Sequence, residues 1–300
     1  MRKILKWFLI ALGVLIGVVF LGLAVFYFKG KAMAERKHDI VVEAISIPTD
    51  AASIERGKHF VQAICSDCHG ANLAGKLMIK APFVTLYSAN LTAGKGGAGA
   101  NFTNTDWVRA IRHGVDDQGR NLMLMPAQLF WNFSDKDLGD IIAYLKSLPP
   151  VDNEQPDPQV TALGRIMVGA GLFGDAIVPA NVIAHDQRPP VVPQGLTAAY
   201  GEYLVSVSGC HDCHGAQLAG GKSNKPGAID APNLTPGGDL KTWADAQFIN
   251  TIRTGQTPTG RMLNPNEMPW QHFGPNYSDD ELKAIFLYLQ SLPALETVKP

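Results

Sequence analysis

The chain contains 300 residues, of which 46% are hydrophobic and 18% charged, and its formal net charge is −1. This balance is typical of a folded globular protein and excludes a long disordered chain. Three basic residues lie within the first six positions, so the remainder is mildly acidic. No lysine- or arginine-rich stripe runs through the chain, and the sequence therefore predicts no nucleic-acid partner.

The first predicted element is a helix that crosses a membrane. Residues 7–28 form a run of 22 positions without a charge, which as a helix spans about 33 Å and matches a bilayer core of about 30 Å. Residues 32–34, Ala-Met-Ala, resemble a signal-peptidase site, but the apolar region of a signal peptide is usually only about 7–15 residues long. We expect an uncleaved anchor within residues 1–30, followed by a linker over residues 31–52. A mature N-terminus at Glu35 would instead indicate cleavage.

Residues 53–150 form the first of two similar units, which we predict to be a separate domain. The unit contains the cysteine cluster CSDCH at 65–69, followed by a glycine-punctuated stretch and by Asn-Leu-Thr at 90–92. Ile-Arg-x-Gly at 111–114 and Met-Pro at 125–126 come next.

Residues 151–196 are rich in proline and have no counterpart in the repeat, so we interpret them as an inter-domain linker. The apolar middle of this segment, residues 162–184, contains Arg165, Asp175, Pro179 and several glycines. It is therefore a poor membrane span, and we expect it to pack across the two domains.

Residues 197–300 repeat the pattern of the first unit and form the second predicted domain. CHDCH lies at 210–214, Asn-Leu-Thr at 233–235, Ile-Arg-x-Gly at 252–255 and Met-Pro at 268–269. The spacing from the threonine to the methionine is the same in both copies, which supports this alignment.

Each unit closes with an amphipathic helix. Its apolar side chains recur at spacings of three and four, at Leu138, Ile141, Ile142, Leu145 and Leu148 in the first copy and at Leu282, Ile285, Phe286, Leu289 and Leu292 in the second. Ser134 and Ser278 are the predicted caps. In the first helix of each unit, Gly57 and Gly201 would permit a close helix crossing. No β alternation is evident, so both units are predicted to be all-α with long loops.

The two cysteine clusters carry the chemistry. Two cysteines three positions apart on a helical turn point their sulfurs the same way, and a histidine directly after the second faces whatever the sulfurs hold. Haem c matches this arrangement, because Cys65 and Cys68 can add to its two vinyl groups while His69 becomes an axial ligand of the iron. The second unit offers the same set of side chains at Cys210, Cys213 and His214.

Two other readings of a CxxC pair fit less well. Zinc modules usually bring two such pairs together over about 15–20 residues, whereas these pairs are separated by a complete helical unit. A redox dithiol on a thioredoxin-like fold would need a βαβ pattern, which the sequence lacks.

With these motifs, each unit resembles a class I cytochrome c domain, and the pair behind an apolar helix resembles the membrane-anchored dihaem cytochromes c. The resemblance covers residues 53–150 and 197–295. It implies an all-α fold in which an N-terminal transmembrane helix is followed by two tandem class I cytochrome c domains. It also implies two covalently attached haem c groups with their iron.

The second axial ligand in that family is a methionine on a loop before the last helix, which by resemblance is Met125 in the first unit and Met268 in the second. A thioether ligand raises the reduction potential of haem iron. The alternative role of a methionine is core packing, and Met123 is a near rival of Met125.

The family resemblance also implies supporting groups around each histidine ligand. A proline carbonyl usually accepts a hydrogen bond from its second ring nitrogen, and Pro232 fits that role. The first copy has Ala89 at this position, so Pro82 or another carbonyl must serve. Arg112 and Arg253 are candidates for pairing with haem propionates, and the alternative for each is a solvated surface position. The remaining histidines outside the repeated positions are expected at the surface or at helix caps: His59, His113, His185 and His272.

The leading interpretation of function is electron transfer, not catalysis. A reduced partner would deliver electrons to one haem, and they would pass through the other to an acceptor. The shared motifs resemble those of cytochrome subunits of periplasmic alcohol and sugar-acid dehydrogenases. This resemblance implies a dehydrogenase subunit or another redox protein as donor, and a cytochrome or oxidase as acceptor.

Two alternatives stay open at this point. One is the dihaem subunit of a terminal haem-copper oxidase, which also carries a span and two such domains but with a more compact spacing. The other is a dihaem peroxidase or a thiosulfate-oxidising enzyme, which would need an open or unusually ligated iron. Two Met-Pro motifs argue for two closed sites.

Basic residues flank both ends of the apolar run, so their distribution alone does not orient it. The resemblance implies haem attachment outside the cytoplasm, and both cysteine clusters follow the run. We therefore expect a single-pass protein of the bacterial inner membrane, with a cytoplasmic N-terminus and both haem domains on the periplasmic or outer side.

Overall fold

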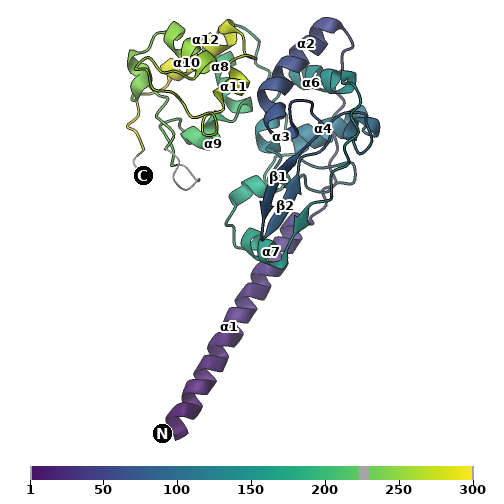
Figure 1. Ribbon diagram of the computed structural model, residues 1–300, viewed down its shortest axis with the longest axis vertical. Helices are drawn as coiled ribbons and strands as arrows, with labels where there is room; N and C mark the ends of the chain where they lie inside the picture. The colour runs from purple at the N-terminus through teal and green to yellow at the C-terminus, as the bar shows by residue number, and fades with distance from the viewer. Residues whose placement is uncertain (1, 223–229, 299–300) are drawn as a thin grey trace.

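The computed structural model describes residues 2–222 and 230–298. It consists of one long N-terminal helix and two mostly helical domains, and the second domain lies beside the first (Figure 1). The predicted all-α class, with an apolar N-terminal helix in front of two domains, is confirmed at this level.

The N-terminal helix α1 (Arg2–Ala34) extends away from both domains (Figure 1). Its most apolar window has a mean hydropathy of 2.9, and none of that window is buried in the protein. A helix of this length and composition fits a membrane anchor, and it also fits a signal sequence. Gly30, near its C-terminal end, is its one buried residue within the described part of the chain.

The first domain is built from short helices joined by loops. They are α2 (Ala51–Phe60), the π-helix η1 (Val61–Cys65), α3 (Ser66–His69), the 3-10 helix η2 (Ala98–Ala100), α4 (Asn104–His113), α5 (Ala127–Phe130) and α6 (Asp135–Ser147). Side chains cap the longer ones: Asp50 accepts a hydrogen bond from the Ser53 amide, and Thr103 and Asp106 form a capping box. Ser134 caps α6 as predicted.

The second domain repeats this order. Its helices are α8 (Ala198–Val207), α9 (Cys210–His214), the 3-10 helix η5 (Asp239–Thr242), α10 (Asp245–Thr254), α11 (Trp270–Phe273) and α12 (Asp279–Ser291). Ser278 and Glu281 form a capping box at the start of α12. Gly255, with a φ of 73°, ends α10 in the left-handed conformation that glycine tolerates.

In each domain the first and last long helices cross at a glycine. Gly57 of α2 lies against the carbonyl of Asp140 in α6, and Gly201 of α8 lies against the carbonyl of Ala284 in α12. A side chain at either glycine would overlap that carbonyl oxygen, so the crossing requires glycine. The predicted close crossings are confirmed.

A small antiparallel sheet, which the sequence did not predict, lies in and beside the first domain. It contains β1 (Leu77–Ala81), β2 (Val84–Tyr87) and β3 (Gln159–Val160) in that order, with Lys80 opposite Thr85 and Val84 opposite Val160. The strands are too short to show an alternation, and the third comes from a distant segment. Both features hide a sheet from periodicity analysis.

The segment between the domains also differs from the prediction. It contains β3, α7 (Ala162–Gly169), the 3-10 helix η3 (Gly174–Ile177) and the 3-10 helix η4 (Pro179–Asn181). Its apolar residues pack against β2 and the end of α1, forming a core of Val84, Leu86, Val168, Ile177 and Val178. The expectation that this segment packs across the two domains was wrong, because its buried apolar residues pack against the sheet and the end of α1.

The main hydrophobic core is continuous through both domains. Trp107, Leu138 and Ile142 of the first domain and Leu204 and Leu289 of the second belong to one cluster of buried side chains. Helix α5 contacts α8, and helix α11 contacts the π-helix η1. In each contact, the helix that follows a Met-Pro motif meets the helix that precedes the other domain's cysteine cluster. The two domains therefore meet through a nearly reciprocal interface.

Candidate functional site

The first cysteine cluster lies on a widened helical turn. Cys65 ends the π-helix η1, and Cys68 and His69 belong to α3. The Ser66 amide donates to the Val61 carbonyl, which gives the turn its extra width. Cys65 and Cys68 form no disulfide with each other, and burial raises the pKa of the Cys65 thiol to about 12.

The second cluster reaches its position by a different route. Helix α8 ends at Val207, and Gly209 takes a left-handed conformation with a φ of 71° before α9 begins at Cys210. The crossing glycine of this domain lies one residue farther from its cysteine than in the first domain. In the second domain, the break in the helix at Gly209 accommodates the extra residue. The first domain uses a continuous helix with a π turn.

The ring of His69 is oriented by the backbone. Its Nδ1 lies 2.8 Å from the carbonyl oxygen of Ala89, so Nδ1 carries the proton and Nε2 is left to bind a metal. Burial lowers the pKa of His69, and this hydrogen bond partly offsets the effect. A neutral imidazole is the form that coordinates iron. The carbonyl expected from Pro82 or another residue is that of Ala89.

His214 is held in the same way. Its Nδ1 lies 2.8 Å from the carbonyl oxygen of Pro232, the residue expected from the sequence. Burial lowers the pKa of His214 as well. The equivalence of Ala89 and Pro232 shows that the contact depends on the backbone carbonyl, not on proline.

The Asn-Leu-Thr motif fixes that carbonyl, a role that sequence reasoning missed. Asn90 Oδ1 accepts hydrogen bonds from the Thr92 amide and hydroxyl, both at 2.9 Å, and Asn90 Nδ2 donates to the Val151 carbonyl at 2.7 Å. The second copy makes the same contacts through Asn233, Thr235 and the Leu295 carbonyl. Each motif thus ties the loop beside the histidine to the chain that follows the last helix. The sequence feature that could have indicated this role is the occurrence of the motif in both copies.

The arginine of each Ile-Arg-x-Gly motif binds protein groups. Arg112 donates to the Phe133 carbonyl and to Asp135 Oδ1, both at 2.7 Å, and its side chain is fully buried. Arg253 donates to the Gly274 carbonyl and, at 2.6 Å, to Asp279. These contacts join the helix before the methionine loop to the start of the closing helix. They do not support the suggested pairing of either arginine with a haem propionate.

The backbone conformation at and after each Met-Pro motif is similar in the two copies. The Met125 carbonyl accepts from the Ala127 amide at 2.7 Å, and the Met268 carbonyl accepts from the Trp270 amide at 2.8 Å. Pro126 and Pro269 have ψ values of 56° and 52°. The backbone from each methionine into the following helix is therefore alike in the two copies.

The packing of the three methionines differs. Met125 and Met268 are half-buried against the main core, which also contacts Cys65 and Cys210. Met123 packs instead against the smaller core beside the sheet. Leu124, with a φ of 66°, turns the chain between them. This arrangement favours Met125 over Met123 as the side chain that faces the first cysteine cluster.

The residues at both sites fit haem c. Each site offers a cysteine pair, a histidine with its Nε2 unoccupied by the backbone contact, a half-buried methionine and apolar walls from the main core. The zinc alternative finds no support, because the structure groups no three His, Cys, Asp or Glu side chains for a metal ion within residues 2–222 and 230–298.

One of the remaining histidines, His113, is not the surface residue that the sequence predicted. His113 is fully buried, with Nε2 3.0 Å from Glu43 and Nδ1 3.1 Å from the Nδ1 of His185. Glu43 also pairs with Arg112 and Arg188. Glu43 lies in the predicted linker after the anchor, and no sequence pattern indicated these partners.

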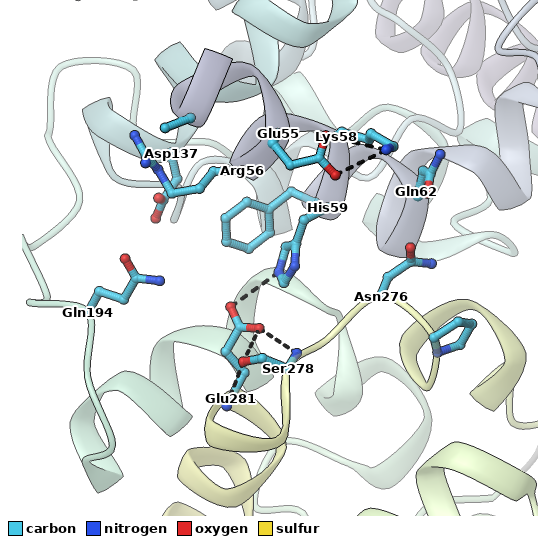
Figure 2. Close-up of a pocket in the computed structure, with 13 residues that line it drawn as sticks. Glu55, Arg56, Lys58, His59, Gln62, Asp137, Gln194, Asn276, Ser278 and Glu281 are labelled. Atoms are coloured by element: carbon cyan, nitrogen blue, oxygen red, sulfur yellow. Dashed lines mark hydrogen bonds and ion pairs between the residues drawn. The ribbon is translucent and has the colours of Figure 1, made fainter. Parts of the chain in front are cut away.

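His59 lies at the boundary between the domains, beside a cavity of about 730 Å³. Figure 2 shows its ring pointing toward Glu281, and its Nε2 lies 3.2 Å from Glu281 Oε1. The ring also contacts Tyr277, with 5.2 Å between ring centroids. His272 pairs with Asp67 at 3.5 Å across the same boundary. His59 and His272 thus contact the other domain, which the sequence did not predict.

Comparisons with known proteins agree with this geometry. The chain is 29% identical over 275 residues to the fructose dehydrogenase cytochrome subunit of Gluconobacter japonicus, covering 82% of this chain and 55% of that protein. It is 29% identical to the cytochrome c subunit of the alcohol dehydrogenase (quinone) of Gluconobacter oxydans (strain 621H), covering 82% and 56%. It is 28% identical to the gluconate 2-dehydrogenase cytochrome c subunit of Pantoea cypripedii, covering 81% and 60%.

The chain thus spans little more than half the length of these relatives. The family model for cytochrome c matches it twice, at residues 54–149 and 198–293. These two matches contain both cysteine clusters and both Met-Pro loops. The chain therefore belongs to the cytochrome c family.

Proposed function

We propose that this protein carries electrons, through two covalently attached haem c groups, from a dehydrogenase partner to a downstream acceptor. The observation that carries the proposal is the duplicated site, in which each domain combines a cysteine pair, a histidine held through Nδ1 and a half-buried methionine. The haem supplies the redox chemistry, and the protein positions it and tunes its potential.

The proposed ligands follow from these positions. Cys65 and Cys68 would hold the first haem, with His69 and Met125 as axial ligands. The corresponding residues of the second domain are Cys210, Cys213, His214 and Met268. Two axial side chains close each iron to small molecules, so the arrangement favours electron transfer over catalysis at the iron.

The interface between the domains supports transfer from one haem to the other. Helix α11, directly after Met268-Pro269, contacts the π-helix that ends at Cys65. Helix α5, directly after Met125-Pro126, contacts α8, which leads to Cys210. Because electron tunnelling weakens steeply with distance, an interface formed by the ligand-bearing segments favours internal transfer.

The dehydrogenase partner is proposed from the relatives, which are named as cytochrome subunits of fructose, alcohol and gluconate dehydrogenases. A cytochrome or an oxidase would be the acceptor. We propose that α1 is retained as a single-pass anchor in the bacterial inner membrane, with both haem domains on the outer side. Membrane confinement would keep the protein near these partners.

Counting haems in variants tests the proposal. The purified full-length protein should give two haem c groups per chain in a pyridine haemochrome spectrum. C65A/C68A and C210A/C213A should each give one. An unchanged haem content in either double variant would remove that cysteine pair from the proposal.

Carbon monoxide tests the axial ligands and separates transfer from catalysis. Carbon monoxide binds readily only where an axial position is open or weakly held. We expect the reduced wild-type spectrum to be unaffected. Stoichiometric binding at one haem would favour an enzyme that works on a small molecule at that iron.

A further inference from the structure

The segment between the domains contains a short apolar projection, here called the apolar tip and defined as residues 162–173. It consists of α7 and the turn that follows, and Arg165 is its one charged residue. The tip lies against the end of α1 nearest the first domain (Figure 1). The repeat has no counterpart for it in the second domain.

Close contacts give the direction of the tip along α1. Gly30 lies against the Arg165 carbonyl and the Gly169 amide, and Gly169 lies against the Phe26 carbonyl. Helix α7 therefore runs antiparallel to α1, and its later residues lie beside earlier residues of α1, from Gly30 toward Phe26. Phe26 belongs to the uncharged run of residues 7–28, so the tip descends to the level of the apolar part of α1.

The end of the tip is apolar and uncovered. Leu172 is 67% exposed, and Leu163, at the opposite end of α7, is 51% exposed. Gly171, with a φ of 75°, turns the chain here and has open space around it. Large exposed apolar side chains beside an apolar helix mark a surface that avoids water.

The charged group of the tip, the Arg165 guanidinium, points away from the exposed apolar end. The Arg165 guanidinium lies 3.0 Å from Glu35 and 3.3 Å from the Tyr27 hydroxyl. Glu35 follows the end of α1, on the side of the haem domains. Arg165 thus places its charge toward the polar side, as arginine does at a membrane boundary. Lys29 and Lys31 lie at the same end of α1, where basic residues meet lipid headgroups.

We propose that the apolar tip inserts into the outer leaflet of the membrane that holds α1, with Leu172 in the acyl region close to the headgroups. The proposal rests on the proposed retention of α1 as an anchor. Its occupant is lipid, because the exposed apolar surface of the tip continues that of α1 at the level of Phe26. The tip acts as an interfacial element, which lies in the boundary without crossing it.

Insertion would fix the orientation of the first domain on the membrane. Phe83, in the turn between β1 and β2, contacts Phe173, with 5.6 Å between ring centroids. The Phe83 carbonyl also accepts a hydrogen bond from the Thr161 amide at 3.1 Å. The hairpin thus connects the tip to the first domain. A haem domain held at two points would meet its partners in one orientation.

Spin labelling of the full-length haem-loaded protein in lipid nanodiscs tests this proposal. The variant L172C carries the label, and accessibility to oxygen is compared with accessibility to a water-soluble nickel chelate. V18C in α1 is the membrane control, and L287C on α12, where Leu287 is 37% exposed, is the aqueous control. L163C gives a second position on the tip. The unsubstituted protein reports any labelling of the native cysteines.

We expect L172C to resemble V18C, with oxygen favoured over the nickel chelate several-fold more than at L287C. If V18C is protected while L172C and L163C behave as L287C does, the tip lies in water and the inference is overturned although the anchor stands. If V18C also behaves as an aqueous position, the proposed anchor fails, and membrane insertion of the tip fails with it.

Discussion

At the scale of single residues, the choice between two neighbouring methionines decides the first axial ligand. Met125 packs on the core that contacts Cys65, and Met123 packs beside the sheet. We predict that M125L lets one haem per chain bind carbon monoxide after reduction, whereas M123L leaves the spectrum unchanged. Both substitutions keep the side-chain volume, so packing losses stay small. Carbon monoxide binding in M123L alone would reverse the assignment.

Glu43 gives a second prediction at this scale. Burial raises the pKa of Glu43, but hydrogen bonds from His113 and Arg112 outweigh it and lower the pKa to about 2. A depressed carboxyl pKa stabilises the folded protein above the unfolded value of about 4.5, and this contribution is lost as pH falls toward about 2. The shift corresponds to at most about 3 kcal/mol.

The variant E43Q tests this contribution. The substitution removes the negative charge that Arg112 and His113 share, and we expect E43Q to lose up to about 3 kcal/mol of unfolding free energy at pH 7. Urea unfolding of both proteins between pH 7 and pH 3 should show the difference shrinking below pH 4.5. A difference that stays constant over this range would mean that Glu43 is not the titrating group.

Some residues of the two haem sites could be predicted from the sequence, and others could not. The cysteines, histidines and methionines stand in repeated local motifs, and one cysteine and one methionine of each motif set pack against the main core: Cys65, Met125, Cys210 and Met268. The partners of Glu43 lie about seventy positions away along the chain, and no local pattern reports such a contact. The Ala89 carbonyl was missed for a related reason, since a backbone group leaves no mark in the side-chain sequence.

At the scale of elements, the helix crossings are the most constrained contacts. Gly201 has no room for a methyl group beside the Ala284 carbonyl. In a helix, alanine is normally better than glycine by about 0.5–1 kcal/mol, but here the helices must move apart. We predict that G201A destabilises the second domain by about 1–3 kcal/mol, measured by urea unfolding followed through haem absorbance.

A glycine-to-alanine substitution away from the crossing separates packing from the general effect of losing a glycine. Gly195 lies just before α8, has open space around it and has no positive φ. We expect G195A to unfold at the same urea concentration as wild type or slightly above it. Equal destabilisation by G195A and G201A would show that the crossing is not the cause.

At this scale, sequence periodicity predicted the closing helices but not the strands. The closing helices α6 and α12 were predictable because a long apolar stripe and a serine cap agree. Strands β1 to β3 were not, because each has at most five residues and β3 joins from beyond the first domain. Helix α7 was interpreted only as apolar, since its partner α1 lies more than a hundred positions away.

At the scale of the whole molecule, the boundary between the domains decides whether the two haem sites work together. His59 lies on helix α2, which continues into the π-helix that ends at Cys65, and its ring contacts Tyr277 of the second domain. Tyr277 is buried, and its hydroxyl lies 2.6 Å from that of Ser208, two residues before Cys210. These side chains form a packed bridge between the segments that hold the two cysteine clusters.

We predict that H59A slows electron exchange between the haems several-fold while leaving both haems attached and both closed to carbon monoxide. Loss of the ring removes packed atoms from the bridge, and tunnelling through a gap is weaker than through packed protein. Rapid photoreduction followed by the relaxation of the two haem absorbances measures the exchange. Lys58→Ala is the control, because Lys58 lines the same cavity and pairs with Glu55 of its own helix. If H59A and the control relax at the wild-type rate, electrons pass by another route, and the contacts of α5 with α8 become the next candidate.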